Sequence, residues 1–245
     1  MNGAIFGRIS TAGGADVHNL LQDTGFSKAS RSMSHSAALE KFLRLSPVMP
    51  VVTVSDASVA ADLARALVRG GIRVIEVTLR TPVALLAIER IAREVPEITV
   101  GAGTVLSVAD LQAAAKAGAA FAISPGATEA LLAAGTNGPI PYLPAIATAS
   151  ELMAGLAAGY SCFKFFPAGA AGGTAMLSSL GGPFPDARFC PTGGITQSSV
   201  KSYLDLPNVL CAGGSWLTPA EAVARRDWAA IEALAAKAAA SRTTV

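Results

Sequence analysis

The sequence contains very little histidine. Its 245 residues include two histidines, His18 and His35, and both lie within the first forty residues. If that region is an appendage, the folded domain contains no histidine. A Ser-His or Cys-His triad and a histidine-ligated metal site are then excluded. The chemistry must depend on lysine, carboxylates, arginine, threonine or backbone groups.

Cysteine is also scarce, and its spacing carries no metal or redox motif. Cys162, Cys190 and Cys211 each lie in a short apolar run, and no CxxC or Cys/His spacing is present. Isolated cysteines in apolar runs are typical of reduced core residues in a cytosolic protein. We therefore expect three buried thiols, no metal site and a cytoplasmic protein.

The sequence lacks both a strong charge excess and a long apolar run. Charged residues make up 15% of the chain and the formal net charge is +2, which gives no general electrostatic footprint for nucleic acid. No apolar run reaches the ~18 residues that indicate a membrane span. Arg8 and Asp16 interrupt any candidate signal peptide. We expect neither a nucleic acid nor a membrane as partner.

Residues 1–35 are rich in Ser, Gly, Asn and Ala and show no lasting periodicity. We interpret them as a disordered N-terminal extension, followed by a single domain over residues 36–245. A short helix at Ala37–Leu45 is expected to lead into this domain.

From Val48 onward, short β-branched runs alternate with alanine-rich helical stretches. The expected strands are Met49–Val54, Val74–Leu79, Thr99–Thr104, Phe121–Ser124, Tyr142–Ala145, Cys162–Phe166, Arg188–Pro191 and Val209–Ala212. This alternation implies a parallel sheet with right-handed crossovers. Eight units in about 180 residues favour an α/β fold of the closed (β/α)8 type, a single TIM barrel, with a terminal helix over Pro219–Ala240. No GxGxxG follows the first strand, which argues against a Rossmann domain.

One expected strand, Cys162–Phe166, contains a lysine in an apolar setting. Because side chains alternate between faces, Lys164 shares a face with Cys162 and Phe166. If both faces of the sheet are covered, Lys164 must be desolvated or must line a cavity. Burial disfavours the ammonium form and favours the free amine that a Schiff-base nucleophile requires. The alternative is an edge strand with the lysine in water.

Other polar residues lie near the carboxyl ends of the expected strands, where barrel active sites are found. Glu76 is expected to point into the barrel, and Arg80 is either an anion clamp or a surface cation. Glu76 could pair with Lys164 for structural reasons alone, but such a pair would also supply the proton transfers of Schiff-base chemistry. Thr104 and Thr192 either donate hydrogen bonds to a ligand or cap helices.

Glycines follow the last two expected strands, as Gly193-Gly194 and as Gly213-Gly214 before Ser215. Glycine allows a backbone N–H to approach a ligand closely, and helix N-termini favour anions. Barrels frequently bind phosphate in these two loops. We therefore predict a phosphate site at Gly193, Gly194, Gly214 and Ser215; the alternative is that these glycines only relieve crowding in tight turns.

Taken together, six ordered motifs resemble the class I 2-keto-3-deoxy-6-phosphogluconate (KDPG) aldolases, a family also known for 4-hydroxy-2-oxoglutarate aldolase activity. The motifs cover Glu76–Thr81, Val100–Val105, Ala122–Gly126, Phe163–Ala168, Arg188–Ile195 and Gly213–Trp216. The resemblance is continuous from about Pro47 to Pro219.

The resemblance implies a role for each of four polar residues. Lys164 would form the Schiff base and Glu76 would be the general acid and base. Arg80 and Thr104 would bind the carboxylate of the pyruvyl part of the substrate. The family needs no metal or other cofactor, and its products are pyruvate and glyceraldehyde 3-phosphate in the Entner–Doudoroff pathway.

The resemblance also implies a phosphate site at Gly193, Gly194 and Ser215. Further residues would line the substrate pocket: Thr192, Pro125 and Phe166. The expected partner is a small molecule, a phosphorylated 2-keto-3-deoxy sugar acid or pyruvate. Members of the family are (β/α)8 barrels and typically homotrimers.

Two positions depart from the family pattern. Gly169 follows Phe-Pro-Ala where members often have glutamate, and Ala145 follows Pro144 where the pattern is Pro-Gly. Both positions can reshape the rim of the pocket. The alternatives are therefore cleavage of 4-hydroxy-2-oxoglutarate or of 2-dehydro-3-deoxy-6-phosphogalactonate, and a non-aldolase barrel that isomerises or only binds a phosphosugar.

Overall fold

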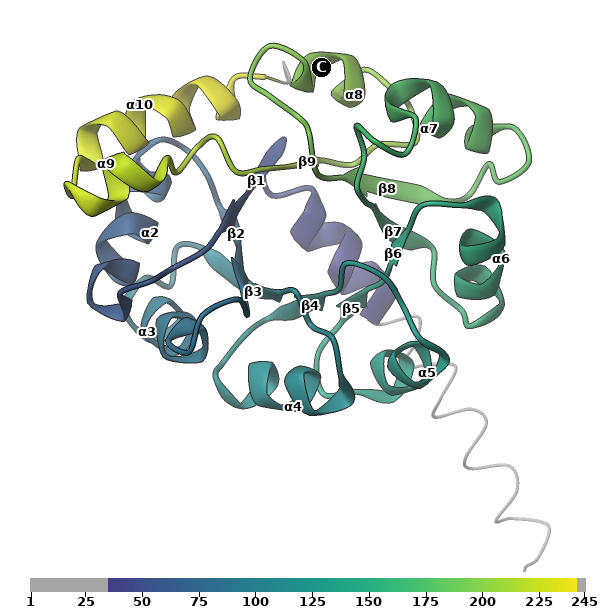
Figure 1. Ribbon diagram of the computed structural model, residues 1–245, viewed down its shortest axis with the longest axis horizontal. Coiled ribbons are helices and arrows are strands. Elements are labelled where there is room, and N and C mark those ends of the chain that lie inside the picture. Colours follow the sequence, from purple (N-terminus) through teal and green to yellow (C-terminus); the bar gives the residue numbers. More distant parts are fainter. Residues whose placement is uncertain (1–34, 242–245) are drawn as a thin grey trace, which may run out of the picture.

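The computed structural model describes residues 35–241 of the chain, and it has an α/β architecture. Figure 1 shows the strands in the middle of the molecule and the helices around the outside. The predicted disorder of residues 1–35 falls, apart from His35, outside the described residues.

All strand pairings in residues 35–241 are parallel. The strands are β1 (Val48–Val52), β2 (Val74–Thr78), β3 (Thr99–Gly103), β4 (Phe121–Ile123), β5 (Tyr142–Leu143), β6 (Ala145–Ile146), β7 (Cys162–Phe165), β8 (Arg188–Pro191) and β9 (Ala212–Gly214). The helices are residues 35–43, the 3-10 turn η1 (Ala57–Val59), α2 (Ala60–Arg69), α3 (Ala84–Glu94), α4 (Val108–Lys116), α5 (Glu129–Asn137), α6 (Ala149–Ala157), α7 (Gly173–Gly181), α8 (Val200–Leu204), α9 (Ala220–Ala224) and α10 (Trp228–Ala239).

The strands form two parallel sheets. The first has the order β5-β4-β3-β2-β1-β9 and the second has the order β6-β7-β8. The chain passes from one sheet to the other at Pro144, between β5 and β6. Isolated parallel bridges join Phe189 to Val209 and Thr192 to Gly213. The described architecture is therefore α/β with a curled parallel sheet of six strands and a second sheet of three, which is less than the complete eight-stranded barrel that the sequence predicts.

Arg188–Pro191 has the predicted bounds, and five other strands differ from their predictions by one or two residues at an end. The remaining two predicted strands are divided or displaced. The run Tyr142–Ala145 is divided at Pro144, because proline has no N–H to donate to a neighbouring strand. The run predicted at Val209–Ala212 is displaced, and β9 covers Ala212–Gly214, since Met49 and Pro50 of β1 pair with the two glycines. Pairing with a neighbouring strand outweighs the low strand propensity of glycine here.

The predicted terminal helix over Pro219–Ala240 is two helices, α9 and α10. Arg226 has a φ of 54°, which ends the first helix. Asp227 then begins the second, because its side chain accepts a hydrogen bond from Ala230 N at 3.1 Å.

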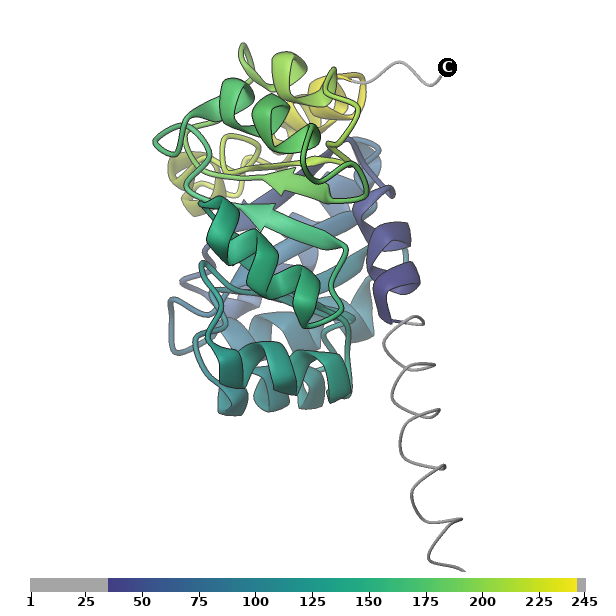
Figure 2. The same cartoon turned by 90° about the vertical axis from the view of Figure 1, so that its right-hand side faces the viewer.

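Helix 35–43 packs across the amino-terminal ends of the strands. A helix was expected at Ala37–Leu45, and the observed one begins and ends two residues earlier. Figure 2 shows it at the end of the molecule opposite the strand arrowheads. Leu39 and Leu43 are buried in a cluster with Met49, Phe121, the three cysteines and other apolar residues, and Phe42 stacks on Phe121 with 5.7 Å between ring centroids. A second and larger apolar cluster lies between the sheets and the outer helices.

His35 belongs to this helix, so the conditional inference that the folded domain contains no histidine is wrong. His35 lines a small cavity with Tyr160, Ser161 and Cys162 at the amino-terminal end of β7. The cysteine there is a poor nucleophile, because burial raises the pKa of the Cys162 thiol to about 11. His35 Nδ1 has no hydrogen-bond partner within residues 35–241, so this atom makes no hydrogen bond to the Cys162 thiol.

Residues 35–241 contain neither a candidate metal site nor a candidate membrane span. Within residues 35–241, no group of three His, Cys, Asp or Glu side chains could hold a metal ion. In the same part of the chain, none of the helices combines the length and the hydropathy needed to cross a bilayer.

Candidate active site

The strand register determines which side chains face the interior of the sheets. Glu76 pairs in register with Val51 of β1 and Gly101 of β3, and Lys164 pairs with Cys190 of β8. Register partners in a parallel sheet point to the same face. Glu76 and Lys164 contact each other although β2 and β7 belong to different sheets and lie on opposite sides of the centre in Figure 1. Their shared face is therefore the interior.

Lys164 and Glu76 form a buried ion pair. Lys164 Nζ donates to Glu76 Oε1 at 3.1 Å and to Oε2 at 3.4 Å. The two side chains are 5% and 1% exposed. A buried charge without a partner is strongly destabilising, so each residue requires the other. The alternative of an edge strand with Lys164 in water is wrong.

Two neighbours define the surroundings of this pair. The ring of Phe166 lies 5.4 Å from Lys164 Nζ, within the range of a cation–π interaction. On the other side, a Cβ at Gly103 would overlap with the Glu76 carboxylate. Glycine at the end of β3 therefore leaves the space through which Glu76 reaches Lys164.

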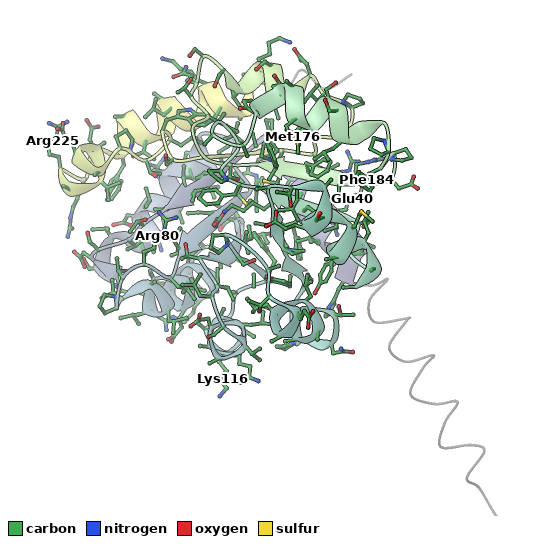
Figure 3. The ribbon with its side chains drawn as sticks, turned by 45° about the vertical axis from the view of Figure 1, so that its right-hand side comes forward. Glu40, Arg80, Lys116, Met176, Phe184 and Arg225 are labelled. Atoms are coloured by element: carbon green, nitrogen blue, oxygen red, sulfur yellow. The ribbon has the colours of Figure 1, made fainter. Side chains whose placement is uncertain are left out.

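Arg80 and Thr104 lie side by side after β2 and β3. The Arg80 side chain, labelled in Figure 3, is exposed, and its Nε donates to Thr104 Oγ1 at 3.1 Å. Thr104 has a φ of 58°, a left-handed conformation that is unfavourable for a β-branched residue. It does not cap a helix, because Ser107 is the N-cap of α4. Of the two alternatives for Thr104, capping of α4 is excluded, and a hydrogen bond to a ligand stays a prediction.

The loop after β8 has the backbone conformation that only glycine adopts easily. Gly193 and Gly194 have φ values of 97° and 75°. The loop after β7 is held against this loop, since Ala168 N donates to Thr192 O at 2.8 Å and Gly169 N donates to Gly193 O at 2.9 Å. These bonds bring the segment that follows Lys164 next to the predicted phosphate glycines.

The glycine pair after Cys211 plays a different part. A Cβ at Gly213 would overlap with the Thr192 side chain, and a Cβ at Gly214 would overlap with the Trp216 ring. Both positions therefore have no space for a Cβ, and the phosphate contact of Gly214 stays a prediction. The next residue, Ser215, is exposed beyond the end of β9. Thr192 is buried and does not cap α8, whose N-cap is Ser199.

Pro125 is half-buried after β4, next to Ser124. The Ser124 hydroxyl shares a hydrogen bond with the Tyr142 hydroxyl, and burial raises the pKa of Tyr142 to about 12. Within residues 35–241, no hydrogen bond joins Arg80, Pro125 or Ser215 to Lys164 or Glu76. The structure thus brings the two predicted catalytic residues, Lys164 and Glu76, together directly, while Arg80, Pro125 and Ser215 lie on separate loops after β2, β4 and β9.

The two departures from the family pattern are both close to this site. Ala145 is the register partner of Lys164. A Cβ at Gly169 would meet Gly193 O and Gly194 Cα at 3.5 Å, which is ordinary contact, so neither space nor an unusual φ requires glycine at this position.

One residue was missed by the sequence reasoning, Thr53, which directly follows β1. Its Oγ1 lies 2.9 Å from the Oγ1 of Thr78, and Thr78 Oγ1 donates to Val52 O at 3.1 Å. Thr53 faces the interior because Val51, two residues earlier, is the register partner of Glu76. A single threonine after an apolar run is a weak signal, since strand propensity alone explains it.

Comparison with known proteins gives one consistent result. The family profile "Aldolase: KDPG and KHG aldolase" matches residues 39–234. The chain is 54% identical over 192 residues to the 2-dehydro-3-deoxy-phosphogluconate aldolase of Pseudoalteromonas atlantica, which covers 78% of this chain and 89% of that protein. It is 53% identical over 199 residues to the KHG/KDPG aldolase of Escherichia coli K12, which covers 81% of this chain and 93% of that protein. It is also similar to the crystal structure of KDPG aldolase from Legionella pneumophila with pyruvate captured as a covalent carbinolamine intermediate, with a TM-score of 0.81 and 48% identity over 82% of this chain and 98% of that one. The chain therefore belongs to the KDPG and KHG aldolase family.

Proposed function

We propose that this protein is a class I aldolase that cleaves 2-dehydro-3-deoxy-6-phosphogluconate to pyruvate and glyceraldehyde 3-phosphate through a Schiff base on Lys164. The observation that carries the proposal is the buried pair of Lys164 and Glu76, 3.1 Å apart. A carbinolamine of pyruvate, as captured in the Legionella relative, requires an amine nucleophile. Lys164 is the one buried lysine in residues 35–241.

The pair has the groups that each step of such a reaction needs. Transfer of a proton from Lys164 Nζ to Glu76 leaves a free amine, which attacks C2 of the substrate, and the carbonyl oxygen takes the proton from Glu76. Loss of this oxygen as water gives the iminium. Glu76 then accepts the proton of the C4 hydroxyl while the C3–C4 bond breaks, and the bonding electrons pass into the enamine. Protonation at C3 and hydrolysis release pyruvate and restore Lys164.

The two ends of the substrate would bind on opposite sides of this pair. Arg80 and Thr104 would hold the carboxylate, supported by their mutual hydrogen bond and the exposed guanidinium. Gly193 and Gly194, with Ser215, would hold the phosphate through backbone N–H groups and a hydroxyl. The remaining contacts would come from Thr192, Pro125 and Phe166.

We further propose that residues 36–245 form one closed (β/α)8 barrel. The bridges between β8 and the segment around β9 support closure on one side. On the other side, Lys164 N donates to Pro144 O at 2.9 Å and Ser124 N donates to Leu143 O at 3.4 Å, so the strand interrupted at Pro144 has neighbours on both sides.

The family resemblance supports a homotrimer, which sedimentation equilibrium would test. The three thiols support a reducing, cytoplasmic location.

Borohydride reduction in the presence of pyruvate, followed by peptide mass spectrometry, tests the proposed mechanism. A pyruvyl adduct on the peptide containing Lys164 is the expected result. A folded protein that gives no adduct would contradict the aldolase function and favour a barrel that only binds or isomerises a phosphosugar.

A second substrate, 4-hydroxy-2-oxoglutarate, is favoured by one specific observation: the Escherichia coli relative is a KHG/KDPG aldolase. Specificity constants for substrates with and without the distal phosphate separate the two activities. Comparison of the gluconate and galactonate epimers then determines the preference at C4.

A further inference from the structure

We propose that Thr53 is a specificity-determining residue that accepts a hydrogen bond from a hydroxyl group in the middle of the substrate. This inference rests on the proposed function. It adds to the proposed site a residue that contacts neither the carboxylate nor the phosphate of the substrate.

The position of Thr53 places it between the two proposed anion sites. β1 lies between β2 and β9 in the six-stranded sheet. β2 leads to Arg80, and β9 leads to Ser215. Thr53 follows the carboxyl end of β1, is exposed there, and shares the interior face with Glu76. A substrate that extends from Arg80 to Ser215 would pass this hydroxyl.

The hydrogen bonds around Thr53 determine which kind of group it can bind. A threonine hydroxyl has one proton and two lone pairs. Thr78 is fully buried and donates its proton to Val52 O, which can only accept. Thr78 Oγ1 must then accept at its contact with Thr53, so Thr53 uses its own proton on Thr78. Thr53 Oγ1 therefore presents only lone pairs to the site.

An acceptor of this kind distinguishes a hydroxyl group from an anionic oxygen. A substrate hydroxyl can donate to Thr53 Oγ1, whereas a carboxylate has no proton to donate, and its oxygens are repelled. The phosphorylated sugar acid has a hydroxyl at C5, where 4-hydroxy-2-oxoglutarate has a carboxylate. Thr53 should therefore favour the sugar acid over the dicarboxylate.

The test is the variant Thr53→Val, which keeps the shape of the side chain and removes the hydroxyl. We expect the ratio of kcat/KM for 2-dehydro-3-deoxy-6-phosphogluconate to kcat/KM for 4-hydroxy-2-oxoglutarate to fall roughly three- to tenfold, the effect of one hydrogen bond. The conservative variant Thr53→Ser keeps the acceptor and should retain the wild-type ratio. Formation of the pyruvate adduct on Lys164 should be the same in all three proteins, because pyruvate has no C5.

Two results would count against the inference. An unchanged ratio in Thr53→Val, which includes an equal loss for both substrates, or a Thr53→Ser variant that behaves like Thr53→Val would each overturn it, while a wild-type adduct on Lys164 keeps the aldolase function intact. A wild-type protein that forms no adduct would overturn the proposed function, and this inference with it.

Discussion

At the amino-terminal ends of the strands the interior is filled by apolar side chains and thiols, whereas at the carboxyl-terminal ends it contains charges, hydroxyls and unusual backbone conformations. Leu39 and Leu43 of helix 35–43 are buried at the first end. The second end contains the Lys164–Glu76 pair and the left-handed Thr104. Buried charges and strained residues are costly, so we infer that packing at the first end offsets part of this cost.

The contrast between the two ends also concerns reactivity. Lys164 and its register partner Cys190 are neighbours on the interior face, and Cys190 contacts Cys211 with 3.4 Å between sulfur atoms. Burial raises the pKa of Cys162 to about 11, so this thiol stays neutral at physiological pH. Lys164 thus has a buried thiol, Cys190, beside it on the interior face, and substitutions at each end test how far the two ends are independent.

The largest effect is expected from Lys164→Ala, which should abolish cleavage and borohydride trapping, because no other buried amine is available in residues 35–241. Lys116→Ala, at an exposed lysine of α4, is the control and should keep full activity. Loss of Lys164 leaves Glu76 buried without its partner, at a cost of about 3–5 kcal/mol. The double variant Lys164→Met/Glu76→Gln removes both charges and should be equally inactive. Cleavage at the wild-type rate in either variant would disprove the assignment of Lys164 as the Schiff-base lysine.

Glu76→Gln should retain some imine formation with pyruvate while slowing cleavage by roughly 10²–10⁴-fold, because the amide cannot accept the proton of the C4 hydroxyl. Single-turnover kinetics would separate the two steps. If imine formation and cleavage fell by the same factor, Glu76 would act only as the structural partner of Lys164.

Leu43→Ala tests the opposite end. Leu43 is fully buried, so truncation should lower the free energy of unfolding by about 2–5 kcal/mol. Activity of the folded protein should stay within about twofold, since the contacts of Leu43 are all at the amino-terminal end. Leu106→Ala, at a leucine that is 63% exposed, is the matched control. A large loss of kcat in folded Leu43→Ala would show that the two ends are coupled.

Arg80→Ala should raise KM for the substrate roughly 10- to 100-fold and change kcat less, because a charged hydrogen bond to the carboxylate is lost. Arg225→Ala removes an exposed arginine of similar type, far along the chain on the α9 side of Figure 3, and should have no effect. Equal KM values for Arg80→Ala and the wild type would make Arg80 a surface cation.

The smallest effect concerns Glu151, whose carboxylate accepts from Ala147 N at 2.7 Å and Thr148 N at 2.9 Å at the start of α6. These bonds hold the pKa of Glu151 below its usual value, with the Ala147 bond as the main cause. The contribution of Glu151 to stability is therefore present above the unfolded pKa and is lost as the pH falls through the folded pKa.

Glu151→Gln should lower the free energy of unfolding by less than about 1 kcal/mol at neutral pH, and the difference from wild type should vanish in acid. Denaturant unfolding at several pH values, with exposed Glu97→Gln as control, measures this. A difference that persists in acid would exclude the carboxylate as its cause.

Much of the fold was predictable because the signals are local. Alternating β-branched and alanine-rich runs reflect strand and helix preferences that each segment has by itself. The predicted strand Arg188–Pro191 has the observed bounds. Tyr142–Ala145 is divided at Pro144, and Val209–Ala212 is displaced because β9 pairs with β1. Lys164 was also recognisable from the sequence as a candidate site residue, since a lysine is rarely buried in an apolar strand without a partner or a function.

The sequence by itself thus determined the order of the elements and the apolar strand around Lys164. It also placed glycine at positions 193 and 194, where the backbone adopts positive φ. Only the tertiary structure decided that Glu76 meets Lys164 across 88 residues of sequence, that the Thr53 and Thr78 hydroxyls share a hydrogen bond, and that His35 is part of the folded domain. These contacts depend on register and on the curvature of the sheets. Both are properties of many strands together, so no single stretch of sequence specifies them.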